Sequence, residues 1–182
     1  MLYNHAERLT RKGYHAISIS RPDTETKWNG PTRVAEDGWI EGDSIIAYDP
    51  GDTEGQYNLT LNKGDAVYLT GTRKGQPAEI AKIDEMFEDP EKHIWMRITY
   101  FWRPERIRLK DDVDWHEYEL FLNPEPEPEE NPSTTIELTP VHVHEARDAS
   151  AWLNLPNTFF YRRSFRERGA PEDIGGSGGR AH

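Results

Sequence analysis

The chain has 182 residues, of which 30% are charged, and its formal net charge at neutral pH is −11. Because it contains no cysteine, disulfides, cysteine-ligated zinc and cysteine nucleophiles are excluded, and no apolar run approaches the roughly 20 residues of a membrane span. A net charge of this sign opposes binding to a phosphate backbone and favours basic partners such as histone tails.

The first third of the chain predicts short strands separated by irregular segments. The segment 21–38 predicts a loop, because Pro22, Gly30 and Pro31 interrupt it. Around it lie segments with the alternation and turn signals of strands. These predicted strands are 14–20, 38–49 (one or two strands), 56–62 and 66–69.

The middle of the chain carries the two longest predicted strands. In 79–89, Ile80, Ile83 and Phe87 fit helical spacing, but the position between short loops favours a strand that bends or ends at a turn. Residues 93–102 give the clearest strand. Alternate side chains share one face of a strand, so the first face carries Ile94, Met96, Ile98, Tyr100 and Trp102, and the second carries Trp95, Arg97, Thr99 and Phe101.

The remainder of the chain predicts further short strands and a polar end. Three segments have strand character: 118–123, 133–146 (broken at Pro140) and 157–165. Between the first two lies the acidic, proline-alternating loop "PEPEPEEN". The Gly-rich stretch 166–182 predicts a disordered tail. Many short strands between closely spaced turns indicate a β-barrel or sandwich.

Several of these segments follow one another in a familiar order. "GDAVYL", "EIAKIDEMFED", "IWMRITYFWRPE", "YELFLN", "TTIELTPVHV" and "NTFFYRRSF" together resemble the bromo-adjacent homology (BAH) domain, over roughly residues 60–165. The most specific part is "FWRPE" followed by "YELFLN". The resemblance implies three parts: an N-terminal extension (1–55) that packs on the core or is partly disordered, a BAH domain (56–165) and the disordered tail (166–182).

The resemblance carries expectations about fold and function. It implies a mostly β fold, a distorted antiparallel β-barrel with short helical insertions and irregular terminal extensions. It also implies a nuclear, non-catalytic module without cofactor or metal, found in chromatin proteins that include gene-silencing readers. Several members of this family bind methylated lysine on histone tails through an aromatic cage, so a methylated histone tail, of H3 rather than H4, is the expected partner, beside other chromatin proteins.

The aromatic end of the strand 93–102 fits such a cage. A methylated ammonium keeps its charge and is attracted to the faces of aromatic rings. Tyr100 and Trp102 are two positions apart and point to the same side, so both can form walls, and the family uses these two positions. Glu105, just past the strand, could supply a carboxylate, and Pro104 ends the strand because it lacks an N–H.

The third wall departs from the family pattern. Many methyl-lysine readers have an aromatic residue where this chain has Glu79. A carboxylate at this position could contact a lower methylation state, or it could mean that no cage forms. Tyr68 is a possible substitute wall, although in the family this position more often belongs to the core. Simple packing of Tyr100 and Trp102 in an amphipathic strand is the alternative.

Charged segments suggest where other partners would bind. A dense acidic run between the aromatic strand and "YELFLN" could line the path of a basic tail, or could be only a solvated loop. Its candidate residues are Asp111, Asp112, Asp114, Trp115 and Glu117. Contact with DNA would involve at most the basic cluster Arg162, Arg163 and Arg166.

Two other classes of function stay open. One is a BAH scaffold that docks a protein or the nucleosome surface without reading methyl-lysine, in which case Tyr100 and Trp102 are buried. The other is a metal-dependent β-barrel enzyme centred on His142 and His144, which lie on one strand face but lack a third ligand at suitable spacing. No GxSxG, P-loop or HExxH motif occurs in the chain.

Overall fold

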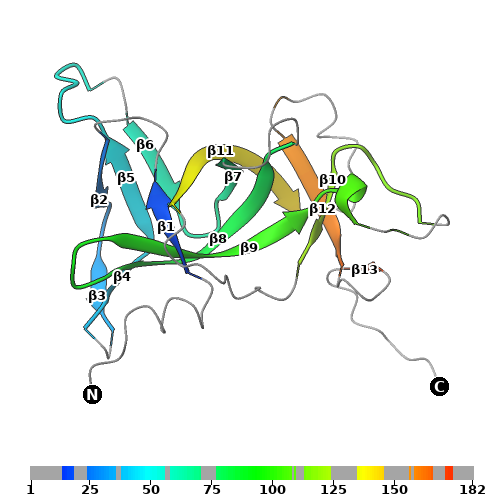
Figure 1. Ribbon diagram of the computed structural model, residues 1–182, viewed down its shortest axis with the longest axis horizontal. Helices are drawn as coiled ribbons and strands as arrows, with labels where there is room; N and C mark the ends of the chain where they lie inside the picture. The colour runs from blue at the N-terminus through cyan, green and yellow to red at the C-terminus, as the bar shows by residue number, and fades with distance from the viewer. Residues whose placement is uncertain are drawn as a thin grey trace.

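The fold is built almost entirely of β-strands (Figure 1). The computed structural model describes residues 14–18, 24–35, 38–55, 58–70, 77–107, 109, 113–123, 135–145, 156, 158–165 and 171–173. The elements in chain order are β1 (Tyr14–Ser18), β2 (Glu25–Trp28), β3 (Thr32–Val34), β4 (Ile40–Gly42), β5 (Ser44–Tyr48), β6 (Asn58–Asn62), β7 (Ala66–Thr70), β8 (Glu79–Glu88), β9 (Ile94–Trp102), the 3-10 turn η1 (Pro104–Arg106), β10 (Glu119–Leu122), β11 (Thr135–Glu145), β12 (Thr158–Ser164) and β13 (Glu172–Asp173).

The strands form two sheets. The larger sheet has ten strands in the order β13-β12-β10-β9-β1-β11-β7-β8-β4-β3, with additional pairings β12–β11 and β9–β8. The smaller sheet has the order β2-β5-β6. Most pairings are antiparallel, but β1–β11, β10–β12 and β11–β12 are parallel. In Figure 1 the long strands β8 and β9 extend from the region of β4 toward the region of β10 and β12.

One face of β8 and β9 packs against the smaller sheet. Ile45 of β5 and Leu61 of β6 are almost fully buried and belong to one cluster with the large sheet. The members from the large sheet are Val67, Leu69, Ala81, Ile83, Met86, Ile94, Met96 and Ile98. The partly buried Tyr100 packs at the edge of this cluster. Burying these side chains against each other is the main force that joins the two sheets.

The opposite face of β8 and β9 is also covered. Near the start of β9, Trp95 packs with Phe87 and Trp39, and the indole Nε1 of Trp95 donates a hydrogen bond to the buried Asp89 at 2.8 Å. Near its end, Phe101 joins a cluster whose buried members also include Ala66, Ile80 and Leu120. The predicted division of β9 into two faces is therefore confirmed for its apolar residues up to Phe101. Coverage on both faces explains its dense apolar sequence.

The prediction of a distorted β-barrel with helical insertions is correct only in its β content. No closed barrel is found among the described strands: β3 and β13 lie at the two ends of the sheet order, although the additional pairings β12–β11 and β9–β8 connect strands within it. β8 and β9 pack against the smaller sheet on one face and against two separate clusters on the other, so the strands form layers. Helical insertions are not shown, since η1 is a three-residue turn. None of the described residues forms a helix long and apolar enough to cross a membrane.

The predicted loop 21–38 is wrong, because it contains β2 and β3. Both strands are mostly exposed and pair by backbone hydrogen bonds with β5 and β4, so they lack the apolar alternation that identifies a half-buried strand. Trp28 at the end of β2 packs against the first core cluster, and its Nε1 donates to Glu88 on β8 at 3.1 Å. Its ring lies directly against Gly42, where any Cβ would collide with it.

The predicted break at Pro140 is also wrong, since β11 runs through it. Pro140 pairs with Val67 of β7 on one side. On the other side of β11, the pairing with β1 ends at Glu137 and the pairing with β12 begins at His142. Among the described residues no strand pairs with Pro140 on this second edge, and a proline without an N–H is tolerated at such a position. In the segment predicted to be a disordered tail, Glu172 and Asp173 form β13; most of that segment, and the loop "PEPEPEEN", lie outside the described residues.

Candidate functional site

The last three residues of β9 present two aromatic rings to one side. Tyr100 and Trp102 are half-buried, whereas Phe101 between them is only 4% exposed and points into the core on the opposite face. This alternation follows from the pleat of the strand, which sends successive side chains to opposite sides. Trp102 pairs in register with Phe121 of β10, and Asn123 donates its backbone N–H to the carbonyl of Tyr100 at 3.0 Å. The backbone that carries both rings is therefore held by a neighbouring strand.

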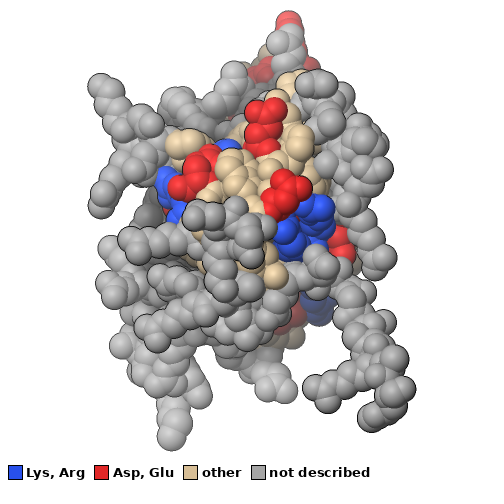
Figure 2. Space-filling model, turned by 90° about the vertical axis from the view of Figure 1, so that its right-hand side faces the viewer, with Lys and Arg blue, Asp and Glu red and all other residues tan. Residues whose placement is uncertain are grey.

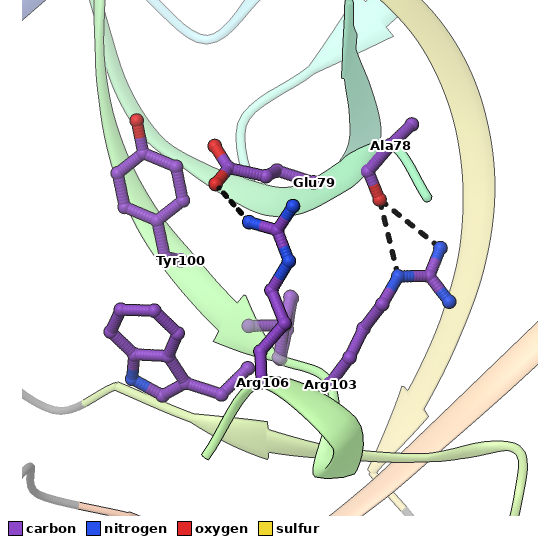
Figure 3. A pocket seen from close by; sticks show the side chains of 7 residues that line it. Ala78, Glu79, Tyr100, Arg103 and Arg106 are labelled. Carbon is purple, nitrogen blue, oxygen red and sulfur yellow. Dashed lines mark hydrogen bonds and ion pairs between the residues drawn. The ribbon is translucent and has the colours of Figure 1, made fainter. Parts of the chain in front are cut away.

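A shallow hollow lies beside these two rings (Figure 3). Its empty volume, including space open to solvent, is about 270 Å³. The lining residues come from the beginning of β8, the end of β9 and η1: Ala78, Glu79, Tyr100, Phe101, Trp102, Arg103 and Arg106. Tyr100 pairs in register with Ala81 on β8, two residues after Glu79, so the carboxylate of Glu79 lies on the same side of the sheet as both rings.

An ion pair closes one side of the hollow. Nη1 of Arg106, at the end of η1, lies 2.9 Å from Oε1 of Glu79. The two side chains are 27% and 37% exposed, respectively. Figure 3 shows the Arg106 side chain extending from η1 toward Glu79, with Tyr100 on one side of it and Arg103 on the other. The carboxylate of Glu79 is thus paired with an arginine that also lines the hollow.

Arg103 is directed away from that carboxylate. Its Nε and Nη2 both donate to the carbonyl oxygen of Ala78, at 3.2 and 3.1 Å, and its guanidinium lies over the ring of Phe159 at 5.2 Å. These contacts tie the end of β9 to the start of β8. The predicted strand end at Arg103 and Pro104 is confirmed, because β9 stops at Trp102 and the buried Pro104 begins η1.

Tyr68 and Glu105 do not line the hollow. Tyr68 pairs with Ile80, which pairs with Phe101, so Tyr68 lies on the opposite face of the sheet from Tyr100. There its ring makes an edge contact with Phe159 at 6.5 Å. Partial burial raises the pKa of the Tyr68 hydroxyl, although the nearby charge of Arg103 acts in the opposite direction. Glu105 is exposed in the first turn of η1.

The family model of the BAH domain matches residues 59–170, more than half of the chain. The chain belongs to the BAH-domain family. Its matched region begins in β6 and extends beyond β12, so it contains both the hollow and the strands that form it. A search of curated proteins gives no match. The boundaries 1–55, 56–165 and 166–182 stay a prediction.

BAH domains are generally non-catalytic modules of chromatin-associated, nuclear proteins. In this BAH domain the residues predicted to line a tail path are only partly described. Asp111 and Asp112 lie outside the described residues. Asp114 and Glu117 are exposed, and Trp115 is 46% exposed. All three precede β10, the strand that pairs with Trp102. Their role in binding a tail stays a prediction.

The predicted basic cluster is largely tied to a buried acid. The carboxylate of Glu119, which has no exposed surface, accepts hydrogen bonds from Nε of Arg162 and Nε of Arg163, each at 3.0 Å. Nη2 of Arg163 also donates to the carbonyl of Asp114 at 2.6 Å. Arg166 lies outside the described residues. Figure 2 views the side of the molecule that holds β10, β12 and η1, where acidic and basic side chains lie next to one another over a neutral surface.

The histidines of β11 are described only in their backbone. His142 and His144 pair in register with Thr158 and Phe160 of β12. Among the described residues, no group of three or more His, Cys, Asp or Glu side chains could hold a metal ion.

The site also contains residues that the sequence did not predict. Arg106, Arg103 and Ala78 line the hollow, yet they belong to no aromatic or acidic pattern. A signal for Arg106 would have been the carboxylate at Glu79, because an acid in place of a cage aromatic can pair with a nearby cation.

Proposed function

We propose that this BAH domain is a non-catalytic chromatin-binding module that holds a methylated lysine of a histone tail in the hollow beside Tyr100 and Trp102. The observation that carries the proposal is the shared orientation of the two half-buried rings next to a carboxylate. The alternative is simple packing of Tyr100 and Trp102 in an amphipathic strand; in favour of the proposal, both rings are only half-buried, although Tyr100 also packs against the first core cluster.

The attraction between such a ligand and the rings has a known size. A cation over an aromatic face gains about 0.5–2 kcal/mol per contact, more as the pair loses water. Methylation favours the transfer of the ammonium from water to the ring faces, because a methylated ammonium keeps its charge but is weakly hydrated. Two rings therefore supply a preference for methylated over unmodified lysine that a flat acidic surface could not give.

The carboxylate of Glu79 would set the preferred methylation state. Mono- and dimethyl-lysine retain an N–H that can donate to a carboxylate, whereas trimethyl-lysine has none. With Glu79 where many readers have a third aromatic wall, we expect the lower methylation states to bind best. Glu105, exposed on η1, would add long-range attraction without lining the hollow.

The rest of the tail would follow the acidic segment before β10. Asp114 and Glu117 are exposed there, and Trp115 offers an apolar surface. The net charge of −11 would speed the arrival of a basic tail. We place histone H3 first among the tails, and a nuclear location with a role in transcriptional silencing follows from the same proposal.

A calorimetric titration tests the proposal. Synthetic histone H3 peptides, either unmodified or with mono-, di- or trimethyl-lysine, are titrated into the wild type, Trp102→Ala and Trp115→Ala. We expect Trp102→Ala to lose the methyl preference. The matched control Trp115→Ala also removes an indole, but outside the hollow, so it should weaken all peptides alike. Equal affinities of the wild type for all four forms at every lysine would overturn the cage.

A second function, docking of a protein or the nucleosome surface without methyl-lysine recognition, is favoured by one observation. The Glu79–Arg106 pair leaves only a shallow hollow. In this case nucleosome binding would be unchanged in Trp102→Ala. Arg162 and Arg163 would contribute little to DNA binding, because their guanidinium groups already pair with Glu119.

A further inference from the structure

We propose that Arg106 is an internal competitor for the ligand cation: its guanidinium occupies the Glu79 carboxylate in the free protein and must leave before a methylated ammonium binds. This inference rests on the proposed function and concerns the regulation of the same hollow.

The net charge of the lining residues disfavours a cationic ligand as long as Arg106 stays in place. Among its seven lining residues Glu79 is the one carboxylate, whereas Arg103 and Arg106 are both cations. The closed arrangement therefore has one more positive than negative charge, which repels a further cation. Arg103 is held by the carbonyl of Ala78 and the ring of Phe159, so it does not neutralise Glu79. The departure of Arg106 brings the charge of the lining from +1 to zero, which removes this repulsion and frees the Glu79 carboxylate for a cationic ligand.

The position of Arg106 makes that departure feasible. It is the last residue of η1, its side chain is 27% exposed, and the Glu79 side chain is 37% exposed. Ion pairs with this exposure contribute little to stability because water and salt screen them. Opening the pair would lower the affinity for the ligand by no more than about fivefold. Arg106 thus weakens binding modestly and selects ligands that use Glu79 better than a guanidinium does.

The chain offers a matched control for this pair. Nε of Arg97 lies 3.1 Å from Oε2 of Glu85, and these side chains are 35% and 37% exposed. This second pair joins β9 to β8, whereas Arg106 reaches β8 from η1, and Arg97 and Glu85 are not among the lining residues of the hollow. Arg97→Ala therefore reproduces the loss of an arginine and of its ion pair with an acid of β8 without opening the site.

The experiment compares four proteins with one probe. A histone H3 peptide with the lysine and methylation state that bind best is titrated into the wild type, Arg106→Ala, Arg97→Ala and the double variant Arg106→Ala with Glu79→Gln. We expect Arg106→Ala to bind two- to fivefold more tightly, and Arg97→Ala to match the wild type. The double variant should lose this gain, because the carboxylate that Arg106 masks is gone.

A second readout follows Arg106 itself. In a ¹⁵N NMR spectrum of the wild type, the guanidinium signals of Arg106 should shift toward those of a solvated arginine as the peptide is added. Equal or weaker binding by Arg106→Ala, with a methyl preference that still depends on Trp102, would overturn the competitor role and leave the proposed function standing. Absence of any methyl preference in both the wild type and Arg106→Ala would overturn both.

Discussion

Arg163 and Glu119 form an ion pair that is almost closed to water. Nη2 of Arg163 lies 2.9 Å from Oε1 of Glu119, and the carboxylate side chain has no exposed surface. The guanidinium of Arg163 also lies over the ring of Phe121, 5.0 Å from its centroid. Because Glu119 begins β10 and Arg163 lies on the parallel strand β12, the pair joins two strands whose backbone register shifts between Leu120 and Phe121.

Loss of the Glu119 carboxylate should destabilise the domain strongly. Glu119→Ala leaves the guanidinium groups of Arg162 and Arg163 partly buried without their acid, and breaking a buried pair in this way costs about 3–5 kcal/mol in free energy of unfolding. Urea unfolding measures the change. The exposed neighbour Glu117→Ala is the control and should stay within about 0.5 kcal/mol of the wild type. A loss below about 1 kcal/mol in Glu119→Ala would contradict this role.

Gly42 should not tolerate a side chain. Its position on β4 places the ring of Trp28 where a Cβ would be, so Gly42→Ala forces the indole or the strand to move, at a cost of about 1–3 kcal/mol. Thermal or urea unfolding measures this loss. Combining Gly42→Ala with Trp28→Leu should cost less than the sum of the two single changes, since the smaller side chain relieves the collision. Strict additivity would show that the ring does not press on this backbone.

Two neighbouring aromatic residues of β9, Phe101 and Trp102, should differ in how much they contribute to stability. Phe101→Ala removes a core ring and should cost about 3–5 kcal/mol of stability. Trp102→Ala removes a half-buried ring and should cost only about 1–2 kcal/mol. Paired urea unfolding curves measure both. If Trp102→Ala proves as destabilising as Phe101→Ala, the indole is a core residue and the proposed reader site loses its second wall.

Stability should fall at alkaline pH through Tyr161. Burial raises the pKa of its hydroxyl first, and the charge of Glu145 and the hydrogen bond to that carboxylate raise it further. The unfolded state therefore loses its proton at about pH 10 while the folded state keeps it, so stability is fully present below this pH and declines above it. Urea unfolding at about pH 8 and about pH 10.5 should show a smaller decline for Tyr161→Phe than for the wild type. Identical declines would contradict the assignment.

The sequence predicted the interior of the domain better than its margins. β9 was found correctly because burial on both faces leaves apolar or aromatic residues at most positions between Ile94 and Trp102, interrupted only by Arg97 and Thr99. β2 and β3 have no such apolar pattern, because these exposed edge strands are held mainly by backbone hydrogen bonds, which depend little on the side chains. The prediction at Pro140 failed for a related reason. A proline interrupts a strand only where neighbouring strands pair with both of its edges, and strand pairing cannot be derived from the local sequence.

In the candidate site, too, local features could be predicted from the sequence, whereas features that depend on strand pairing and packing could not. The rings of Tyr100 and Trp102 and the acid at Glu79 could be found because alternation along one strand and a departure from a family pattern are both local features. The side of the sheet that Tyr68 faces depends on the register of β7 with β8, and the partner of Glu79 depends on how η1 folds back. Neither can be derived from spacing along the chain.

Phe101 has a further consequence for recognition. With its ring in the core and its backbone paired with Ile80 and Leu122, the segment that carries Tyr100 and Trp102 is already fixed in the free protein. The protein then loses little conformational entropy when a ligand binds, so even a small contact area can give useful affinity. Preorganisation of this kind also limits how far the backbone can adapt. Binding of a different ligand would require other side chains in place of these rings.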